Sequence, residues 1–148
     1  MVNRKIETFL IVIGLVVYVF LGVYGATMLN ASNDEEVAKE LYENFIEEMQ
    51  EEGMISSEEE TPTFSEVNET LNIGGKRYLI VAIVAFIVGL ASVFMIAKNK
   101  YPKIAGVLLI LVGYFMGQML SGIFLLGSLM YVPAGIMALF RKPRVRAV

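Results

Sequence analysis

The residues of this 148-residue chain that could do chemistry are mainly carboxylates. Of its 15 acidic residues, 14 lie between Asp34 and Glu69, and the chain has no His, Cys or Trp. Without these side chains there is no imidazole base, no thiol nucleophile, no disulfide and no ligand set for the common zinc sites. The chemistry that remains is that of dense negative charge.

Glutamates recur with helical spacing inside this acidic segment. At 100° per residue, a helix over about residues 33–52 collects five of them on one half of its surface and apolar residues on the other. The five are Glu36, Glu40, Glu43, Glu47 and Glu51. A calcium loop uses Asp and Asn at alternating positions around a Gly, so calcium is not expected here. A solvated face, weak cation binding and capture of a basic partner stay open, and these five are the candidate partner-binding residues.

Most of the remaining chain consists of three runs without a charged residue: Phe9–Leu29, Tyr78–Ala97 and Ile104–Phe140. Roughly 20 apolar residues cross a bilayer core as a helix, so the first two runs each predict one span. The third would measure about 55 Å as one helix, so it must fold back, and Gln118–Gly122 is the predicted turn. The expected spans are residues 9–29, 78–97, 104–119 and 123–140. We therefore predict an all-α polytopic membrane protein, a four-transmembrane-helix bundle with an acidic helical loop between helices 1 and 2.

Basic residues flank these spans asymmetrically. With both termini cytoplasmic, the inner segments carry nine basic residues and one acidic residue, Glu7, whereas the outer side carries three basic residues. The positive-inside rule therefore predicts a multi-pass plasma membrane protein with the acidic segment outside. A cleaved signal peptide is the alternative for the first run, but 21 apolar residues exceed a signal core. The chain then divides into a first helix at 1–29, an acidic outer segment at 30–77, a second helix at 78–97, a basic loop at 98–103, a hairpin at 104–140 and a basic tail at 141–148.

The acidic outer segment is predicted to form two short helices. Ser32 and Glu35 match a capping box for the first, and Gly53 is its expected stop. The second carries apolar residues at helical spacing from Phe64 until Gly74–Gly75 end it. We expect the two apolar faces to pack together over the outer ends of the spans. A helix lying in the membrane interface is the alternative, but such helices are usually rich in Lys and Arg.

The predicted spans hold no charged residue. Proton and ion transporters commonly place an ionisable group inside the membrane. A serine hydrolase needs a base and a Gly-x-Ser-x-Gly elbow, and this sequence has neither. We therefore expect a non-enzymatic protein that uses no metal and no cofactor.

Small residues at helical spacing predict close packing of the spans. They are Gly14 and Gly22, Ala85 and Gly89, and the Gly-x-x-x-Gly pair Gly113 and Gly117. The same pattern serves packing within one bundle or between two copies, so both readings stay open. Pro133 removes one backbone hydrogen bond from the last span and predicts a kink there.

Three tyrosines are predicted to lie at one depth in the membrane. Tyr18, Tyr114 and Tyr131 each fall about 13 to 15 Å from the inner end of their span, near the midplane. Tyrosine prefers the interface, so these hydroxyls should find partners inside the bundle, where Gly89 could make room. We predict a midplane polar cluster, and the alternative is that one or more of the rings face lipid.

Parts of the chain are similar to a known family. They are Lys100–Leu109, Pro133–Lys142 and the N-terminal Arg4–Glu7, which leads into an Ile13-Gly14 helix. With these residues the chain resembles an uncharacterised family of small four-span membrane proteins from Gram-positive bacteria. That resemblance implies a bacterial membrane protein and brings no catalytic or ligand residues with it. The order of loops is also similar to claudin-like proteins, but this loop lacks their Trp and Cys pair.

Two functions compete on this evidence. The first is an accessory, regulatory or scaffold subunit that presents its acidic outer domain to a protein partner, either a membrane protein or an extracytoplasmic one. Trapping of cationic peptides by the acidic loop is a special case of this function. The alternative is a small oligomeric transporter or channel subunit with a cation-concentrating acidic mouth. The expected partners are the lipid bilayer, a protein and, if the small-residue faces serve oligomerisation, a second copy of the chain; nucleic acid is not expected.

Overall fold

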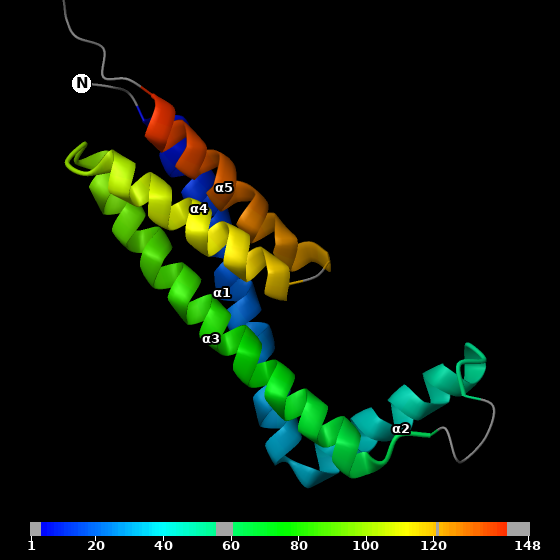
Figure 1. Cartoon of the computed structure of the whole chain (residues 1–148). Helices are drawn as coiled ribbons and strands as arrows, with labels where there is room; N and C mark the ends of the chain where they lie inside the picture. The colour runs from blue at the N-terminus through cyan, green and yellow to red at the C-terminus, as the bar shows by residue number, and fades with distance from the viewer. Residues whose placement is uncertain (1–3, 56–60, 121, 142–148) are drawn as a thin grey trace, which may run out of the picture. The chain divides into compact units, whose positions relative to one another are not determined.

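The computed structural model describes residues 4–55, 61–120 and 122–141 (Figure 1). Within these ranges the chain forms five α-helices and one short 3-10 helix. They are α1 (Lys5–Asn33), α2 (Glu35–Glu51), α3 (Phe64–Ala97), α4 (Pro102–Met119), η2 (Gly122–Phe124) and α5 (Leu125–Phe140). Residues 142–148 of the predicted basic tail at 141–148, the glutamates at 58–60 and Ser121 of the predicted turn lie outside the described residues.

Three of the helices, α1, α3 and α4, are long and apolar enough to cross a membrane, and α5 is a shorter apolar helix. The predicted all-α class is therefore confirmed. At 1.5 Å per residue, α1 and α3 measure about 44 and 51 Å, longer than a bilayer core of about 30 Å. Helix α1 extends past the predicted span 9–29 at both ends, and α3 begins 14 residues before the predicted span 78–97. Helix α3 therefore begins in polar sequence and ends in apolar sequence.

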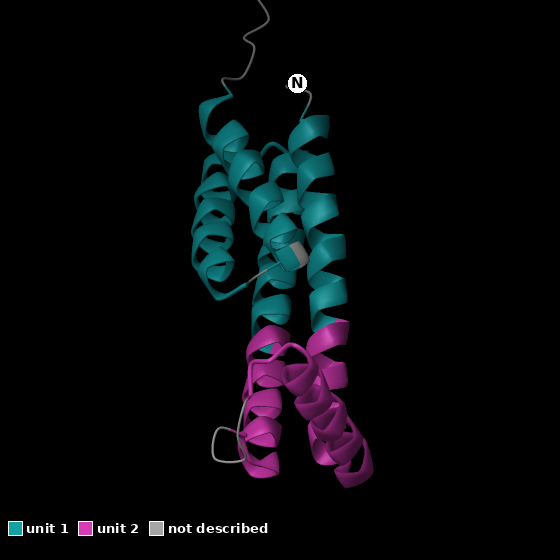
Figure 2. Ribbon diagram, turned by 90° about the vertical axis from the view of Figure 1, so that its right-hand side faces the viewer, with its two compact units in different colours: residues 1–22, 80–148 teal, residues 23–79 magenta. Residues whose placement is uncertain are grey.

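The chain forms two compact units (Figure 2). Unit 1 comprises residues 1–22 and 80–148, and unit 2 comprises residues 23–79. Unit 1 contains the first part of α1, the later part of α3 and the hairpin of α4 and α5, which lie side by side. Its core is built from aliphatic side chains and two tyrosines of these four helices. Unit 2 contains the end of α1, all of α2 and the start of α3.

The third apolar run folds back where the sequence predicts. Helix α4 ends at Met119, Leu120 is extended, and Gly122 has φ +61°, a left-handed conformation that favours glycine. The 3-10 turn η2 then leads into α5, which begins at Leu125 rather than at the predicted residue 123. The short turn keeps α4 and α5 close enough for their small residues to pack together.

The predicted end of the second outer helix at Gly74–Gly75 is wrong, because α3 continues through both glycines. A Cβ atom at Gly75 would lie 2.9 Å from the carbonyl oxygen of Gly25 and 3.0 Å from the backbone nitrogen of Leu29. Gly25 and Gly75 let the backbones of α1 and α3 touch within unit 2. The packing gained offsets the helix propensity that glycine costs, about 1 kcal/mol per residue.

The capping box predicted at Ser32 is wrong as well. Helix α1 continues past this residue, and the Ser32 hydroxyl donates a hydrogen bond to the Leu29 carbonyl at 2.8 Å. Asp34 caps α2 instead, and its carboxylate accepts from the backbone N–H groups of Glu36 at 3.1 Å and Val37 at 3.4 Å. A carboxylate at this position also interacts favourably with the helix dipole.

The predicted stop of α2 at Gly53 is confirmed. Gly53 has φ +70°, and its N–H group donates to the Gln50 carbonyl at 3.1 Å. The next N–H group, of Met54, donates to the Met49 carbonyl at 2.9 Å. This pair of bonds is a Schellman motif, which satisfies carbonyls at a helix end and needs a left-handed residue.

The glycine contact predicts opposite effects for two neighbouring substitutions. Gly75→Ala should lower the free energy of unfolding by about 1–3 kcal/mol, because its methyl group meets backbone atoms that cannot move aside. Gly74→Ala should be neutral or stabilising, because its methyl group meets only the flexible end of Met28 at 3.2 Å. Thermal unfolding of both variants in detergent checks this. Equal melting temperatures for the two would show that the α1 to α3 backbone contact is not tight.

Candidate functional site

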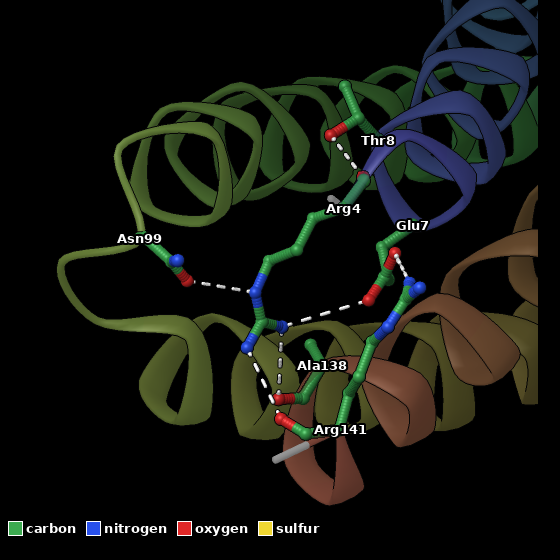
Figure 3. A network of polar contacts seen from close by, with 6 residues as sticks. All are labelled: Arg4, Glu7, Thr8, Asn99, Ala138 and Arg141. Atoms are coloured by element: carbon green, nitrogen blue, oxygen red, sulfur yellow. Dashed lines mark hydrogen bonds and ion pairs between the residues drawn. The ribbon is translucent and has the colours of Figure 1, made fainter. Parts of the chain in front are cut away.

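A buried carboxylate lies at one end of unit 1, in the first turn of α1 (Figure 3). Glu7 is completely inaccessible to solvent. Its Oε2 atom accepts a hydrogen bond from Nη1 of Arg141 at 2.8 Å, and its Oε1 atom lies 3.7 Å from Nη1 of Arg4. A carboxylate this deeply buried requires such partners, because an unpaired buried charge costs several kcal/mol.

Arg4 connects three parts of the chain around this carboxylate. Its Nε atom donates to Oδ1 of Asn99 at 2.9 Å, in the turn between α3 and α4. Its terminal nitrogens donate to the backbone carbonyls of Ala138 and Arg141, each at 3.4 Å, at the end of α5. Figure 3 shows the guanidinium group held between these acceptors. The planar donor fork of arginine is suited to several acceptors at once.

The α3 to α4 turn has the conformation that brings Asn99 to Arg4. Asn99 has φ +54°, the left-handed region that asparagine tolerates better than most side chains. Its N–H group donates to the Ile96 carbonyl at 3.0 Å, and that of Lys100 donates to the Met95 carbonyl at 3.2 Å. These bonds close α3 and turn the chain toward Pro102, the first residue of α4.

The sequence prediction missed this cluster. It treated Arg4 and Arg141 as flanking charges and counted Glu7 only as the one acid among the predicted inner segments. The available signal was that Glu7 is the single acidic residue in residues 1–22 and 80–148, against nine basic residues. Local spacing could not pair it with Arg141, which lies 134 positions away.

Loss of the Glu7 charge should destabilise the protein. Glu7→Gln keeps the shape of the side chain but leaves two arginines without their carboxylate. We expect the free energy of unfolding to fall by about 2–3 kcal/mol. This is less than for an ion pair in which both side chains are buried, because the Arg141 side chain is 36% exposed. Thermal unfolding in detergent measures it.

Glu35→Gln is the matched control, because Glu35 pairs with Lys39 at 2.7 Å on an exposed helix surface. This variant should leave the melting temperature unchanged, since exposed pairs contribute little. A melting temperature of Glu7→Gln equal to that of the control would show that the buried pair does not hold unit 1 together.

Two of the three predicted midplane tyrosines lie together in unit 1. The rings of Tyr18 and Tyr131 are both buried, with centroids 5.0 Å apart. The Tyr18 hydroxyl and Ser128 Oγ are hydrogen-bonded at 3.1 Å, and the Tyr131 hydroxyl donates to the Ala85 carbonyl at 2.8 Å. These bonds join α1, α3 and α5 and give partners to polar groups that are buried.

The prediction that Tyr114 belongs to this cluster is wrong. Tyr114 is 60% exposed on the surface of α4, where its ring packs on Phe115 at 5.7 Å. The prediction used only the distance of Tyr114 along its helix, and that distance does not determine which way a side chain points. Rotation about the helix axis is decided by packing against neighbouring helices.

The predicted small residues lie at helix contacts within the chain. A Cβ atom at Gly14 would lie 2.5 Å from the Tyr131 ring, and one at Gly89 would overlap the Tyr131 hydroxyl. A Cβ atom at each of the other three predicted glycines would also meet a side chain of another helix. The nearest contacts would be Gly22 with Ala82 at 3.3 Å, Gly113 with Val132 at 2.8 Å and Gly117 with Ser128 at 3.2 Å. Ala85 is fully buried. These faces are therefore occupied by helices of the same chain.

The contact between Gly89 and Tyr131 can be tested by rescue. Gly89→Ala should destabilise by about 1–3 kcal/mol, because the methyl group overlaps the Tyr131 hydroxyl. Adding Tyr131→Phe removes that hydroxyl and should restore part of the loss, although by itself it costs a hydrogen bond of about 0.6 kcal/mol. Adding Tyr114→Phe should restore nothing. Thermal unfolding of the four variants checks this, and equal effects of the two Phe substitutions would contradict it.

Unit 2 presents the acidic surface. The five predicted residues, Glu36, Glu40, Glu43, Glu47 and Glu51, are all exposed on α2. Nearby, a hydrogen bond from Lys39, together with its charge, holds the pKa of Glu35 below its ordinary value. The whole of unit 2 has 14 acidic and three basic residues, a net charge of −11. Such a field attracts cationic ligands over distances longer than a hydrogen bond.

The opposite face of α2 is only partly covered by the rest of unit 2. Tyr42 packs edge-on against Phe64 at 5.7 Å, and its hydroxyl donates to the Pro62 carbonyl at 2.8 Å. Leu41 and Phe45, on the same apolar face, remain 43% and 41% exposed. The expectation that the apolar faces of the two outer helices pack together is therefore correct at Tyr42 and wrong at these two residues.

The uncovered apolar residues line a groove of about 670 Å³ between α2, the end of α1 and the start of α3. Its apolar lining is Met28, Ala38, Leu41, Phe45, Pro62, Val67 and Leu71. Its two acidic lining residues are Glu48 and Glu66, neither of which belongs to the five predicted from the sequence. The lining of the groove thus combines apolar side chains with two carboxylates.

These features define an all-helical protein with three helices long and apolar enough to cross a membrane. Residues 3–119 match the family described as Protein of unknown function (DUF4064). The match covers most of the chain, so the protein belongs to this family. No curated protein and no solved structure matches the sequence.

Proposed function

We propose that this protein is a non-enzymatic membrane protein that presents an acidic outer domain to a basic amphipathic partner, as an accessory, regulatory or scaffold subunit. The observation that carries this proposal is the groove of unit 2, where exposed Leu41 and Phe45 lie beside Glu48 and Glu66. A partner that fits must offer apolar side chains and positive charge together. An amphipathic helix with Lys or Arg along one edge has this chemistry.

The proposed topology has four spans and both termini in the cytoplasm. The lengths of α1, α3 and α4 support three of the spans. Helix α5 and the preceding η2 turn together measure about 30 Å, the thickness of a bilayer core. Residues 1–22 and 80–148 contain nine basic residues and one acidic residue. By the positive-inside rule, this excess supports a plasma membrane orientation with both termini and the loop between α3 and α4 in the cytoplasm.

The charge of unit 2 favours a protein partner over a membrane surface. A net charge of −11 opposes contact with anionic lipids, whereas it attracts a cationic polypeptide and orients it before contact. The small-residue faces that an oligomeric channel would use are occupied within the chain, at Gly113, Gly117 and Gly14. The second observation favours the binding function over the transporter alternative.

Binding of a designed peptide to the purified full-length protein in neutral lipid nanodiscs tests the proposal. The probe is a short amphipathic helix of Leu and Lys with a fluorescent label, and its counterpart of Leu and Glu is the charge control. We expect the Lys peptide to bind and the Glu peptide not to bind. Leu41→Asn should weaken binding at least about tenfold, because the groove loses an apolar contact.

Two neighbouring positions provide matched controls. Val37→Asn should leave affinity unchanged, because Val37 is a 39% exposed apolar residue of α2 that does not line the groove. Glu48→Gln should weaken binding more than Glu47→Gln, since only Glu48 lines the groove. Equal effects of Glu47→Gln and Glu48→Gln would assign binding to the general acidic face. Binding to empty nanodiscs as strong as to the protein would refute the proposal.

A further inference from the structure

Unit 1 has a pocket of about 370 Å³ that the proposed function does not use. It lies where the turn between α3 and α4, the first turn of α4 and the end of α5 meet. Four of its lining residues are cations: Arg4, Lys100, Lys103 and Arg141. Of the described residues that line it, none is acidic. A pocket of this size and charge is suited to a small anionic group.

Among the described residues of unit 1, the positive charge around this pocket is only partly neutralised. Glu7 offsets one of the four charges through its contacts with Arg141 and Arg4, so a net charge of +3 remains. Arg4 is also fixed in place by hydrogen bonds to Asn99 and to backbone carbonyls. A guanidinium group that is already ordered pays little further entropy when it binds an anion.

The N-terminus of α4 adds backbone donors to the same pocket. Its N-cap residue, Tyr101, makes no side-chain capping bond, and Pro102 occupies the first position. The first hydrogen bond into the helix is from the Ala105 N–H group to the Tyr101 carbonyl. The N–H groups of Lys103 and Ile104 therefore precede the first helical bond, and both residues line the pocket. Such groups favour anions, and above all phosphates.

We propose that this pocket binds a phosphate group, and that the phosphate belongs to an anionic phospholipid of the inner leaflet. The cationic side chains and the α4 N-terminus contact the phosphate, while the apolar lining residues Ile104 and Leu139 contact the adjoining lipid. Basic pockets between helices on the cytoplasmic side of a membrane are suited to anionic headgroups. The inference rests on the proposed orientation of the helices and not on the groove of unit 2.

Native mass spectrometry of the full-length protein in neutral detergent tests this inference. Phosphatidylglycerol and phosphatidylcholine are added at equal concentrations, and the bound fraction of each is measured. We expect preferential retention of phosphatidylglycerol. The double variant Lys100→Gln with Lys103→Gln should weaken this retention roughly fivefold for each lysine. Both lysines are exposed, so these substitutions should leave the fold intact.

Lys98→Gln is the matched control, because Lys98 is an exposed cation of the same turn that does not line the pocket. It should retain phosphatidylglycerol as the parent protein does. A loss equal to that of the double variant, or equal retention of the two lipids, would overturn the pocket as the binding site.

A second arm separates lipid from free phosphate. Inorganic phosphate is added to the protein with bound phosphatidylglycerol, and thermal unfolding is followed without lipid. We expect millimolar phosphate neither to displace the lipid nor to raise the melting temperature. Displacement together with stabilisation would overturn the lipid assignment in favour of free phosphate. The double variant should bind the Leu and Lys peptide normally, so failure of the lipid site and failure of the groove are distinguishable.

Discussion

The buried carboxylate of Glu7 is the interaction on which the organisation of unit 1 depends. It is the single acidic residue among nine basic residues in residues 1–22 and 80–148, and it is completely buried. Removing a charge from water is costly, so the fold must supply cations with the right geometry, and it does so from Arg4 and Arg141. These partners bring together the start of α1, the α3 to α4 turn and the end of α5. Arg4 and Arg141 also line a pocket together with Lys100 and Lys103.

The two units differ in how they use charge. Unit 1 turns its one acid inward and leaves an excess of cations around a pocket that also contains the N-terminus of α4. Unit 2 turns its carboxylates outward and leaves Leu41 and Phe45 uncovered beside Glu48. Each therefore combines an electrostatic field with a concave surface, which attracts ligands of the opposite sign and gives them contacts at short range. The proposed partners follow from this division: a basic amphipathic segment for one unit and an anionic headgroup for the other.

Several features could be predicted from the sequence because they depend on local composition. The apolar runs predict long helices, the interruption near Gln118–Gly122 predicts the fold back of the chain, and Gly53 predicts the end of α2. The predictions that failed concern residues whose local preference was overridden by packing. Gly74–Gly75 would end an isolated helix, yet α3 continues because Gly75 lets its backbone touch α1 at Gly25. The close contact supplies free energy that local propensity does not include.

The sequence by itself determined that the apolar runs form helices and that acidic and basic residues are segregated along the chain. The tertiary structure decided which side of each helix faces its neighbours and which distant residues meet. Tyr18 and Tyr131 turn inward while Tyr114 turns outward. The sequence could not predict this difference, because a helix that is apolar all round carries no pattern that marks its packed face. The pairing of Glu7 with Arg141 likewise could not be predicted, because the two residues lie 134 positions apart. Charge complementarity acts through space, and only the folded backbone brings those two residues within reach of one another.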